Sequence, residues 1–265
     1  MKKFRIWSWF WIVISVFYFF FPLIVTFLFS LKTLKNQLTF ISYARVLDDS
    51  RFLNSLFFST WVGVVTILFG LVLMVPTVYW VRLKAPKLRP VVEFISLLPF
   101  TIPAIVLVFG LIGVYSGQFI PLTYTQAGTN FLLVAAYVVV GLPYLFRTID
   151  AGMASIDVVT LTEAAQSLGA DWRTIMFKVI VPNLRSAMLG AAFLTLAIVL
   201  GEFTISTFLV GLRAFGPYIW QVNQNRAYEG AALVIISFLL TWLLMGLINF
   251  VGRRGAGASN IAGPR

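Results

Sequence analysis

The side chains in this sequence that could do chemistry are few. There are nine acidic residues, but no histidine and no cysteine. Disulfides, thiolate or imidazole metal ligands and histidine-based acid–base catalysis are therefore excluded. Inside the apolar parts of the chain the acidic residues reduce to Glu202, with Glu93 and Asp150 near the ends of apolar segments. Because no carboxylates cluster, a membrane enzyme is a poor interpretation, and we expect no catalytic residue, no cofactor and no metal.

Glu202 stands in the stretch "LGEFTISTFLVG", in the outer half of an apolar segment. An ionisable group inside a membrane span costs free energy, so such a residue is a candidate functional residue. Two roles are open for it: a gate or structural hydrogen bond, and a contact with a solute that crosses the membrane. Thr204, two residues later, and Pro103, in another apolar segment, complete the candidate path.

The sequence also lacks the residues that bind the phosphates of ATP. None of its seven lysines follows a glycine, so the phosphate loop G-x-x-x-x-G-K-[ST] is absent. If ATP drives this protein, another chain must bind the nucleotide.

The elements that must position these residues are membrane helices. Hydrophobic residues make up 60% of the 265 residues, charged residues 11%, and the mean hydropathy is +0.94, whereas soluble domains are about 45–50% apolar and about 25% charged. Charge-poor windows long enough to cross a bilayer occur at 6–29, 56–80, 92–115, 131–146, 186–210 and 231–251. We therefore expect an all-α fold with six transmembrane helices, the first retained rather than cleaved as a signal peptide.

Lysine and arginine predict the orientation. With six spans, both termini and the loops after spans two and four lie on one side of the membrane, and these parts hold 14 of the 20 basic residues. Basic residues concentrate on the cytoplasmic side, so we expect both termini in the cytoplasm and the protein in the inner (plasma) membrane. The net charge of +11 is then a topology signal rather than a nucleic-acid-binding surface.

Prolines distinguish some spans from others. Pro99 and Pro103 fall inside the third apolar segment, and Pro76 and Pro143 are expected to interrupt the second and fourth. Each proline frees a backbone carbonyl that lipid cannot satisfy, so neighbouring helices or a wet cavity must supply partners. Any one of these prolines is compatible with ordinary kinking, whereas four together favour a bundle packed around a path.

The stretch "LTEAAQSLGADWRTIMFKVIVPNLR", residues 161–185, is more organised than a connecting loop needs to be. A first short helix is predicted by apolar residues at helical spacing: Leu161, Ala164, Ala165 and Leu168. Asp157 or Thr160 can cap its start, and Gly169 with a positive φ can end it. Asp171 can cap a second helix, whose apolar face is Trp172, Ile175, Met176 and Val179. Pro182 suits the first turn of the next segment.

This helix–turn–helix is expected on the cytoplasmic face. An amphipathic helix lying on the membrane is the alternative interpretation, but the first helix lacks the basic polar face and the bulky aromatic residues of an interfacial anchor. The small side chains of Ala164 and Ala165 permit close approach by another surface, so docking against a protein fits better.

The spacing of these residues resembles the EAA loop of the membrane subunits of ABC importers, the binding-protein-dependent permeases. That family has Glu-Ala-Ala, three residues, Gly, nine residues and Ile-x-Leu-Pro. Here Glu163, Gly169 and Pro182 stand in register, while Val179 and Val181 replace the usual isoleucine and leucine. The resemblance covers the six-span architecture from about residue 58 to 251.

The resemblance implies a type I ABC importer permease fold whose loop forms a coupling helix, seated in a cleft of a cytoplasmic ATPase. The coupling residues would be Glu163, Ala164, Ala165, Leu168, Gly169 and Pro182. Thr160 and Glu163 also have the spacing of a capping box, so a local cap is a second role for the glutamate. The implied partners are ABC ATPase subunits, a second permease subunit (identical or a paralogue), an extracytoplasmic solute-binding protein and membrane lipid, with no nucleic acid.

The solute is less well defined than the family. The stretch "LPFTIPAIVLVFGL", the EAA loop and the last span are most similar to permeases for polyamines (spermidine and putrescine). That group also includes relatives for opines, aminophosphonates, thiamine and iron. The Gly-Glu-Phe step at Glu202 also resembles permeases for anions, which argues against a cation-specific ligand there.

The leading hypothesis is therefore a permease subunit of an ABC importer, for a small polar solute such as a polyamine. A self-contained secondary transporter or channel is the alternative, but it leaves the organised loop unexplained and offers few intramembrane charges for ion coupling. We expect three parts: an N-terminal tail, first span and outer loop (1–55), a permease core (56–251) with the coupling loop at 157–182, and a cytoplasmic tail (252–265).

Overall fold

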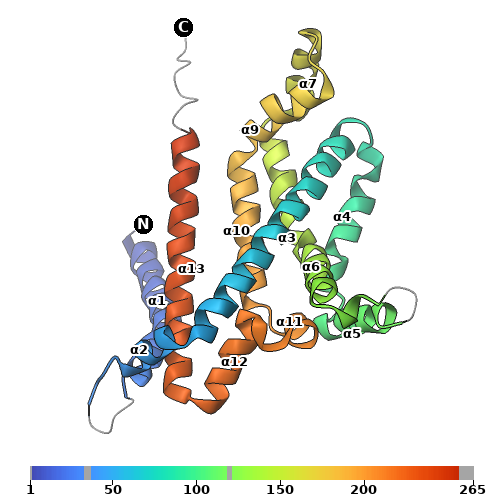
Figure 1. The fold of residues 1–265 in the computed structure, drawn as a ribbon. Coiled ribbons are helices and arrows are strands. Elements are labelled where there is room, and N and C mark those ends of the chain that lie inside the picture. The colour runs from blue at the N-terminus through green and yellow to red at the C-terminus, as the bar shows by residue number, and fades with distance from the viewer. Residues whose placement is uncertain (1, 33–36, 118–120, 257–265) are drawn as a thin grey trace.

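The structure is a computed structural model that describes residues 2–32, 37–117 and 121–256, and the regular elements of these residues are helices (Figure 1). The long helices are α1 (Lys2–Ser30), α3 (Ser50–Leu83), α6 (Gln126–Ser155), α10 (Arg185–Gly201) and α13 (Ala227–Ala256). The shorter ones are α2 (Ile41–Asp48), α4 (Arg89–Leu97), α5 (Ala104–Tyr115), α7 (Val158–Ser167), α8 (Trp172–Thr174), α9 (Val181–Asn183), α11 (Thr204–Leu209) and α12 (Phe215–Asn225). Short 3-10 turns occupy Pro86–Leu88, Leu98–Phe100, Leu122–Tyr124 and Gly211–Arg213, and a π-helix occupies Ile175–Ile180.

Helices α3, α6 and α10 form the centre of the bundle, since each packs against the other two. α3 has 34 residues and α6 has 30, which correspond to about 50 and 45 Å of helix, more than the roughly 30 Å of a hydrocarbon core. α1 packs beside α13. α7 lies at one end of the bundle, and α2, α11 and α12 lie toward the other (Figure 1).

The apolar helices correspond to the six predicted segments. α1, α3 and α6 are each long and apolar enough to cross a membrane, and two further candidates are helix pairs separated by a bend, one over 86–115 and one over 172–201. The apolar part of α13 covers Ala227–Leu243. The predicted fold class, an all-α membrane bundle, is confirmed.

The third apolar segment is not the straight span that we expected. Its two helical halves meet at 96°, and α5 lies across the end of the bundle (Figure 1). The break falls at 101–103, where Pro103 is extended (φ −57°, ψ 136°) and has no amide hydrogen to continue a helix. The amide and hydroxyl of Thr101 both donate to the carbonyl of Leu98, at 2.9 and 2.8 Å, and so close the end of the first half.

Two other expectations about the spans were wrong. Pro76 and Pro143 do not interrupt their helices, because α3 and α6 continue through them. Pro143 is buried, and packing by neighbouring helices allows a membrane helix to continue across one missing hydrogen bond. The fifth segment, 186–210, is broken after Gly201, with α11 starting at Thr204.

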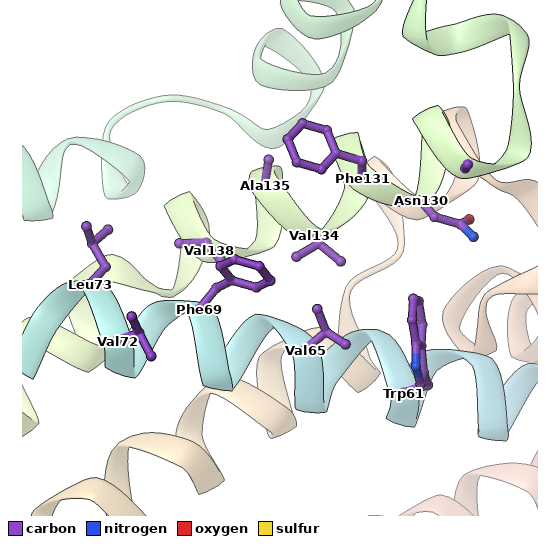
Figure 2. A pocket seen from close by; sticks show the side chains of 11 residues that line it. Trp61, Val65, Phe69, Val72, Leu73, Asn130, Phe131, Val134, Ala135 and Val138 are labelled. Atoms are coloured by element: carbon purple, nitrogen blue, oxygen red, sulfur yellow. The ribbon is translucent and has the colours of Figure 1, made fainter.

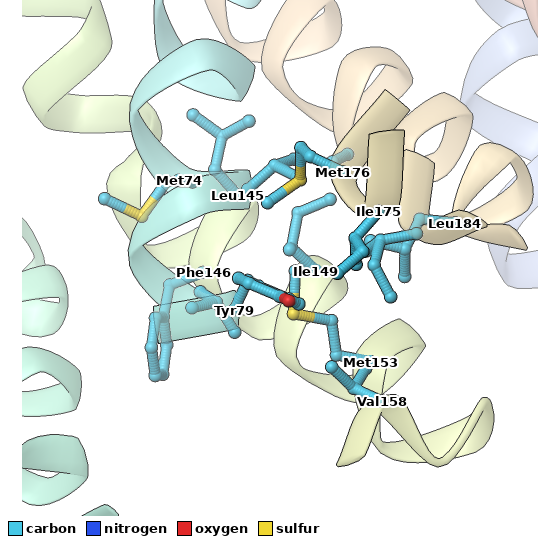
Figure 3. Close-up of a cluster of buried hydrophobic side chains, with 14 residues drawn as sticks. Met74, Tyr79, Leu145, Phe146, Ile149, Met153, Val158, Ile175, Met176 and Leu184 are labelled. Carbon is cyan, nitrogen blue, oxygen red and sulfur yellow. The ribbon is translucent and has the colours of Figure 1, made fainter. Parts of the chain in front are cut away.

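Three clusters of buried apolar side chains stabilise the bundle. The first joins the central helices to the helix pair at 158–183 and includes Met74, Tyr79, Phe146, Met153, Val158 and Met176 (Figure 3). The second joins α3, α5, α6, α10 and α11, and the third joins α2, α3, α12 and α13. The division of the chain at residues 55 and 252 stays a prediction; α3 continues across the first boundary, and 257–265 of the proposed tail lie outside the described residues.

Candidate functional site

The first helix of the predicted pair, α7, begins at Asp157. This residue has φ 43°, and its carboxylate accepts hydrogen bonds from the Thr160 amide (3.5 Å) and the Thr160 hydroxyl (2.7 Å). Asp157 is therefore the cap, not Thr160. Glu163 lies farther along the helix and is exposed, so it does not complete a capping box and its carboxylate points to solvent-accessible space.

The turn after α7 has the geometry that glycine favours. Gly169 has φ +77°, which confirms the predicted positive φ. The Gly169 amide donates to the Gln166 carbonyl (2.9 Å) and the Ala170 amide donates to the Ala165 carbonyl (3.0 Å). This pair of bonds is a Schellman motif, which satisfies carbonyls that a helix end leaves unpaired.

The second helix begins at Asp171 and runs through α8, the π-helix and α9. The Asp171 carboxylate accepts a hydrogen bond from the Thr174 amide (3.0 Å). Hydrogen bonding by Thr174, first through its side chain and then through its amide, holds the pKa of Asp171 below its ordinary value. Pro182 lies in the first turn of α9, where its missing amide costs least. A bend of 72° then leads into α10.

One face of this helix pair is attached to the membrane helices. Val158 and Thr162 are buried, and the Tyr79 hydroxyl of α3 lies 3.2 Å from the Thr162 hydroxyl. Because the Thr162 hydroxyl donates to the Val158 carbonyl (2.7 Å), Tyr79 is the donor in this contact. Ile175 and Met176 of the second helix are buried in the same cluster, as predicted.

The opposite face is exposed. The expected apolar face of α7 is not its buried one, since Val158, Thr162 and Ala165 pack inward whereas Ala164 is exposed and Leu168 is 89% exposed. Trp172 of the second predicted face is likewise 54% exposed, and Phe177 is 67% exposed. Among the residues that the structure describes, no further element covers this side. The predicted coupling residues Glu163, Ala164, Leu168 and Gly169 thus lie together on an uncovered surface at one end of the bundle.

Glu202 lies at the break between α10 and α11, toward the opposite end of the bundle from the helix pair (Figure 1). Its carboxylate accepts hydrogen bonds from the amides of Ile205 (2.8 Å) and Ser206 (3.0 Å) and from the Tyr137 hydroxyl (3.2 Å). These bonds close the start of α11 and tie it to α6. Of the two roles that the sequence left open, this geometry is that of a structural hydrogen-bond acceptor, and the solute contact stays a prediction.

The other predicted path residues lie near the same break. Thr204 is partly buried at the start of α11, and Pro103 is exposed just before α5. α11 packs against α5, with the rings of Phe109 and Phe208 4.9 Å apart. The structure therefore brings these residues to one end of the bundle, separate from the coupling residues.

Two acidic residues of α6 and α4, Asp150 and Glu93, form ion pairs. Asp150 of α6 receives a hydrogen bond from Arg82 Nε (2.7 Å) and forms an ion pair with Arg89 (2.8 Å). Glu93 of α4 lies 3.0 Å from Arg147 of α6. These contacts hold the loop between α3 and α4, and α4 itself, against α6.

Comparison with known proteins identifies the family. Residues 67–256 match the family model described as "Binding-protein-dependent transport system inner membrane component". The chain belongs to this family. The resemblance drawn from the EAA loop is thereby confirmed.

Relatives within the permease family differ in the solutes they are named for. A probable sulfate transport system permease of Chlorokybus atmophyticus is 31% identical over 64% of this chain, and the match spans 63% of that protein's length. A probable molybdenum permease of Haloferax volcanii is 28% identical over 72% of each chain. A spermidine/putrescine permease of Haemophilus influenzae is 23% identical over 72% of this chain and 71% of its own.

Solved structures of permeases share the fold. A chain of a bacterial ABC transporter that imports alginate superposes with a TM-score of 0.72 at 14% identity, covering 96% of this chain and 97% of its own. A chain of the MetNI methionine ABC transporter gives a TM-score of 0.60 at 22% identity, covering 77% and 95%. The fold is that of type I ABC importer permeases.

A groove between α3 and α6 was not predicted from the sequence (Figure 2). It has a volume of about 820 Å³ and is lined mostly by apolar side chains, among them Trp61, Phe69, Phe131 and Val134. The helical spacing of aromatic residues on α3 is a signal for it, but that spacing is equally typical of a lipid-facing surface.

Proposed function

We propose that this chain is the permease subunit of an ATP-driven importer, which forms the path through the membrane and couples it to a separate ATPase without catalysing a reaction itself. The observation that supports this most directly is the helix pair at 158–183. Its ends are satisfied by its own residues, yet Leu168, Trp172 and Phe177 remain exposed. Apolar side chains exposed outside lipid are typical of a contact with another protein.

The attachment of the pair explains how it could transmit motion. Val158, Ile175 and Met176 belong to the same buried cluster as Tyr79 of α3 and Ile149 of α6 (Figure 3). Protein interiors are close-packed and deform little. A displacement of α7 by a partner would therefore move the cytoplasmic ends of α3 and α6 with it, which a flexible loop would not do.

The proposed partners are an ABC ATPase, a second permease subunit, identical or a paralogue, and an extracytoplasmic solute-binding protein. The methionine transporter named above is an ABC transporter, and another solved alginate transporter, with a TM-score of 0.70, is in complex with a periplasmic protein that holds an alginate pentasaccharide. These descriptions support an ABC ATPase and an extracytoplasmic solute-binding protein as partners of this chain. The exposed face of α7 would be the ATPase contact, with Glu163 facing basic residues there.

For the solute we propose a small polar molecule. A polyamine, which the sequence favoured, is the solute named for one relative, whereas two others are named for sulfate and molybdenum. A polyamine is thus one of several classes that the relatives support.

We further propose the inner membrane with both termini cytoplasmic. The chain has no cysteine, so a thiol reagent that labels a single introduced cysteine reacts at no other site in this chain. A cysteine at Lys3 should resist an impermeant thiol reagent in intact cells, and one at Gln37 should react. Labelling at Lys3 from outside would contradict the orientation.

Co-purification tests the function itself. The tagged chain, isolated from its native membrane, should bring with it an ATPase that contains G-x-x-x-x-G-K-[ST], and the hydrolysis rate of the complex should rise with the loaded binding protein. If the chain alone, reconstituted in liposomes without an ATPase, carried out uphill transport, the proposal would be wrong.

A further inference from the structure

A second groove lies between the cytoplasmic half of α6 and the start of α10. It has a volume of about 490 Å³, and its polar lining residues are Arg147, Thr148, Ser155, Asn183 and Ser186. The two helices approach closely beside it, because a Cβ on Gly152 would collide with the Cβ of Ala187. Neither the coupling surface of α7 nor the Glu202 break contributes to this groove.

The groove gives α6 two unlike faces at its cytoplasmic end. Ile149 and Met153 are buried toward α3, whereas Arg147, Ala151 and Ser155 are exposed. A guanidinium and hydroxyl groups are poorly accommodated by lipid, so a polar face on a membrane helix is expected to line water or a partner chain. The α10 side of the groove is polar as well, with Asn183 and Ser186 exposed.

The charged side chain that lines the groove is positive. Arg147 is the one charged side chain among the lining residues that the structure describes, and it is 63% exposed. Its contact with Glu93 of α4 joins Nη2 to Oε1, so the other donors of its guanidinium are not used by that ion pair. The nearby Asp150 carboxylate is held by Arg82 and Arg89.

This arrangement matches the chemistry of an oxyanion. A guanidinium binds sulfate, phosphate or carboxylate groups through paired N–H donors, and the hydroxyls of Thr148 and Ser186 add donors along the same groove. The Ser155 hydroxyl donates to the Gly152 carbonyl (2.7 Å) and offers only its acceptor side. A polyamine would need accessible carboxylates, but Asp150 is held by two arginines, and Glu93, which is less exposed than Arg147, does not line the groove.

We propose that this groove is the water-filled cytoplasmic mouth of the solute path and that Arg147 makes it favour anionic over cationic groups, so that the imported solute carries an oxyanion group rather than being a polyamine. The inference rests on the proposed importer function and names its solute class.

Charged thiol reagents measure this preference without knowledge of the solute. Ser155→Cys and Ser186→Cys are introduced singly into the cysteine-free chain, in the complete purified complex. Each is treated with the anionic sulfonatoethyl and the cationic trimethylammonioethyl methanethiosulfonate. The reference is Gln126→Cys, at the exposed outer end of the same helix. We expect the anion-to-cation rate ratio to be about fivefold higher in the groove than at the reference, as expected for one nearby charge in a wet site.

Matched variants assign the preference to one side chain. Arg147→Gln should make the anion-to-cation rate ratio in the groove equal to that at the reference. Arg173→Gln, at an exposed arginine of α8 outside the groove, should leave the raised ratio unchanged. Glu93→Gln should raise the ratio further, because it releases the Arg147 guanidinium from its ion pair. Equal ratios at the groove and the reference, a preference for the cation, or no reaction at either groove cysteine would overturn the proposal, as would putrescine uptake by the complete importer. ATP hydrolysis is measured on the same preparation. If the importer function is wrong, no ATPase activity will be present, whereas a wrong solute class leaves the ATPase activity intact.

Discussion

Two of the helix breaks in the described part of the chain satisfy their backbone groups in opposite ways. At the break between α7 and α8, the Asp157 cap, the Gly169 turn and the Asp171 cap satisfy the helix ends with local groups and leave an apolar face uncovered. At the break between α10 and α11, the single carboxylate of Glu202 accepts hydrogen bonds from the first amides of α11.

The orientation proposed above explains the difference through the solvent around each break. Outside the membrane, water can complete any backbone group, so an organised turn with exposed Leu168 and Trp172 indicates selection for a contact surface. Within the membrane, unsatisfied amides are costly, so an acidic residue at a break has a structural role before any other. A polar residue inside a span is therefore weaker support for a solute contact than its rarity suggests.

The largest effect is expected for Gly169→Val. A left-handed φ costs a residue with a Cβ roughly 1–2 kcal/mol, and more if it is β-branched. A Cβ placed on Gly169 would have no atom within 4 Å, so backbone strain alone acts. Solute-stimulated ATP hydrolysis should fall about tenfold with normal membrane insertion, and Gly169→Asn, which tolerates this conformation, should retain most of it. Full stimulation in the valine variant would show that the turn is not needed for coupling.

Glu202→Ala should have the next largest effect, on stability. It leaves the amides of Ile205 and Ser206 and the Tyr137 hydroxyl without their acceptor, at a cost of about 1–3 kcal/mol. The thermal midpoint of the purified protein should fall, and it should fall less for Glu202→Gln, which keeps one acceptor oxygen. If Glu202→Gln instead abolished uptake at unchanged stability and basal ATPase rate, the carboxylate would contact the solute and the contrast between the two breaks would be wrong.

Tyr79→Phe should have a smaller effect. It removes the hydrogen bond to Thr162 that attaches α7 to α3. Such a hydrogen bond contributes about 0.5–1.5 kcal/mol to stability. Stimulated hydrolysis should decrease several-fold while ATPase association persists, because the exposed face of α7 is unchanged. Thr162→Val should give the same result, and the double variant should add little to either. Additive losses would show that the two side chains act independently.

Several features of the fold could be predicted because they depend on local chemistry. The apolar segments, the Asp171 cap and the positive φ of Gly169 follow from residue type and spacing alone. The bend at Pro103 and the continuity of α6 through Pro143 could not be predicted, because a proline kinks, breaks or is absorbed by a helix according to its packing. The same limit applied to α7. The spacing of its apolar residues predicted an apolar face, but it did not predict which of those residues the rest of the chain would bury. The ion pairs of Asp150 and Glu93 join residues distant in sequence, and no local pattern indicates them.

Association of the ATPase with an Ala164→Leu variant tests the coupling surface directly. Ala164 is exposed on α7, so the larger side chain leaves the fold of this chain intact but obstructs close docking, and overpacking of a contact typically costs about 1–3 kcal/mol. Ala44→Leu, at an exposed alanine of α2 at the opposite end of the bundle, is the matched control. We predict that Ala164→Leu lowers the amount of ATPase bound per permease about tenfold while the control binds normally. Full association and full stimulation in Ala164→Leu would contradict the assignment of this helix pair as the coupling element.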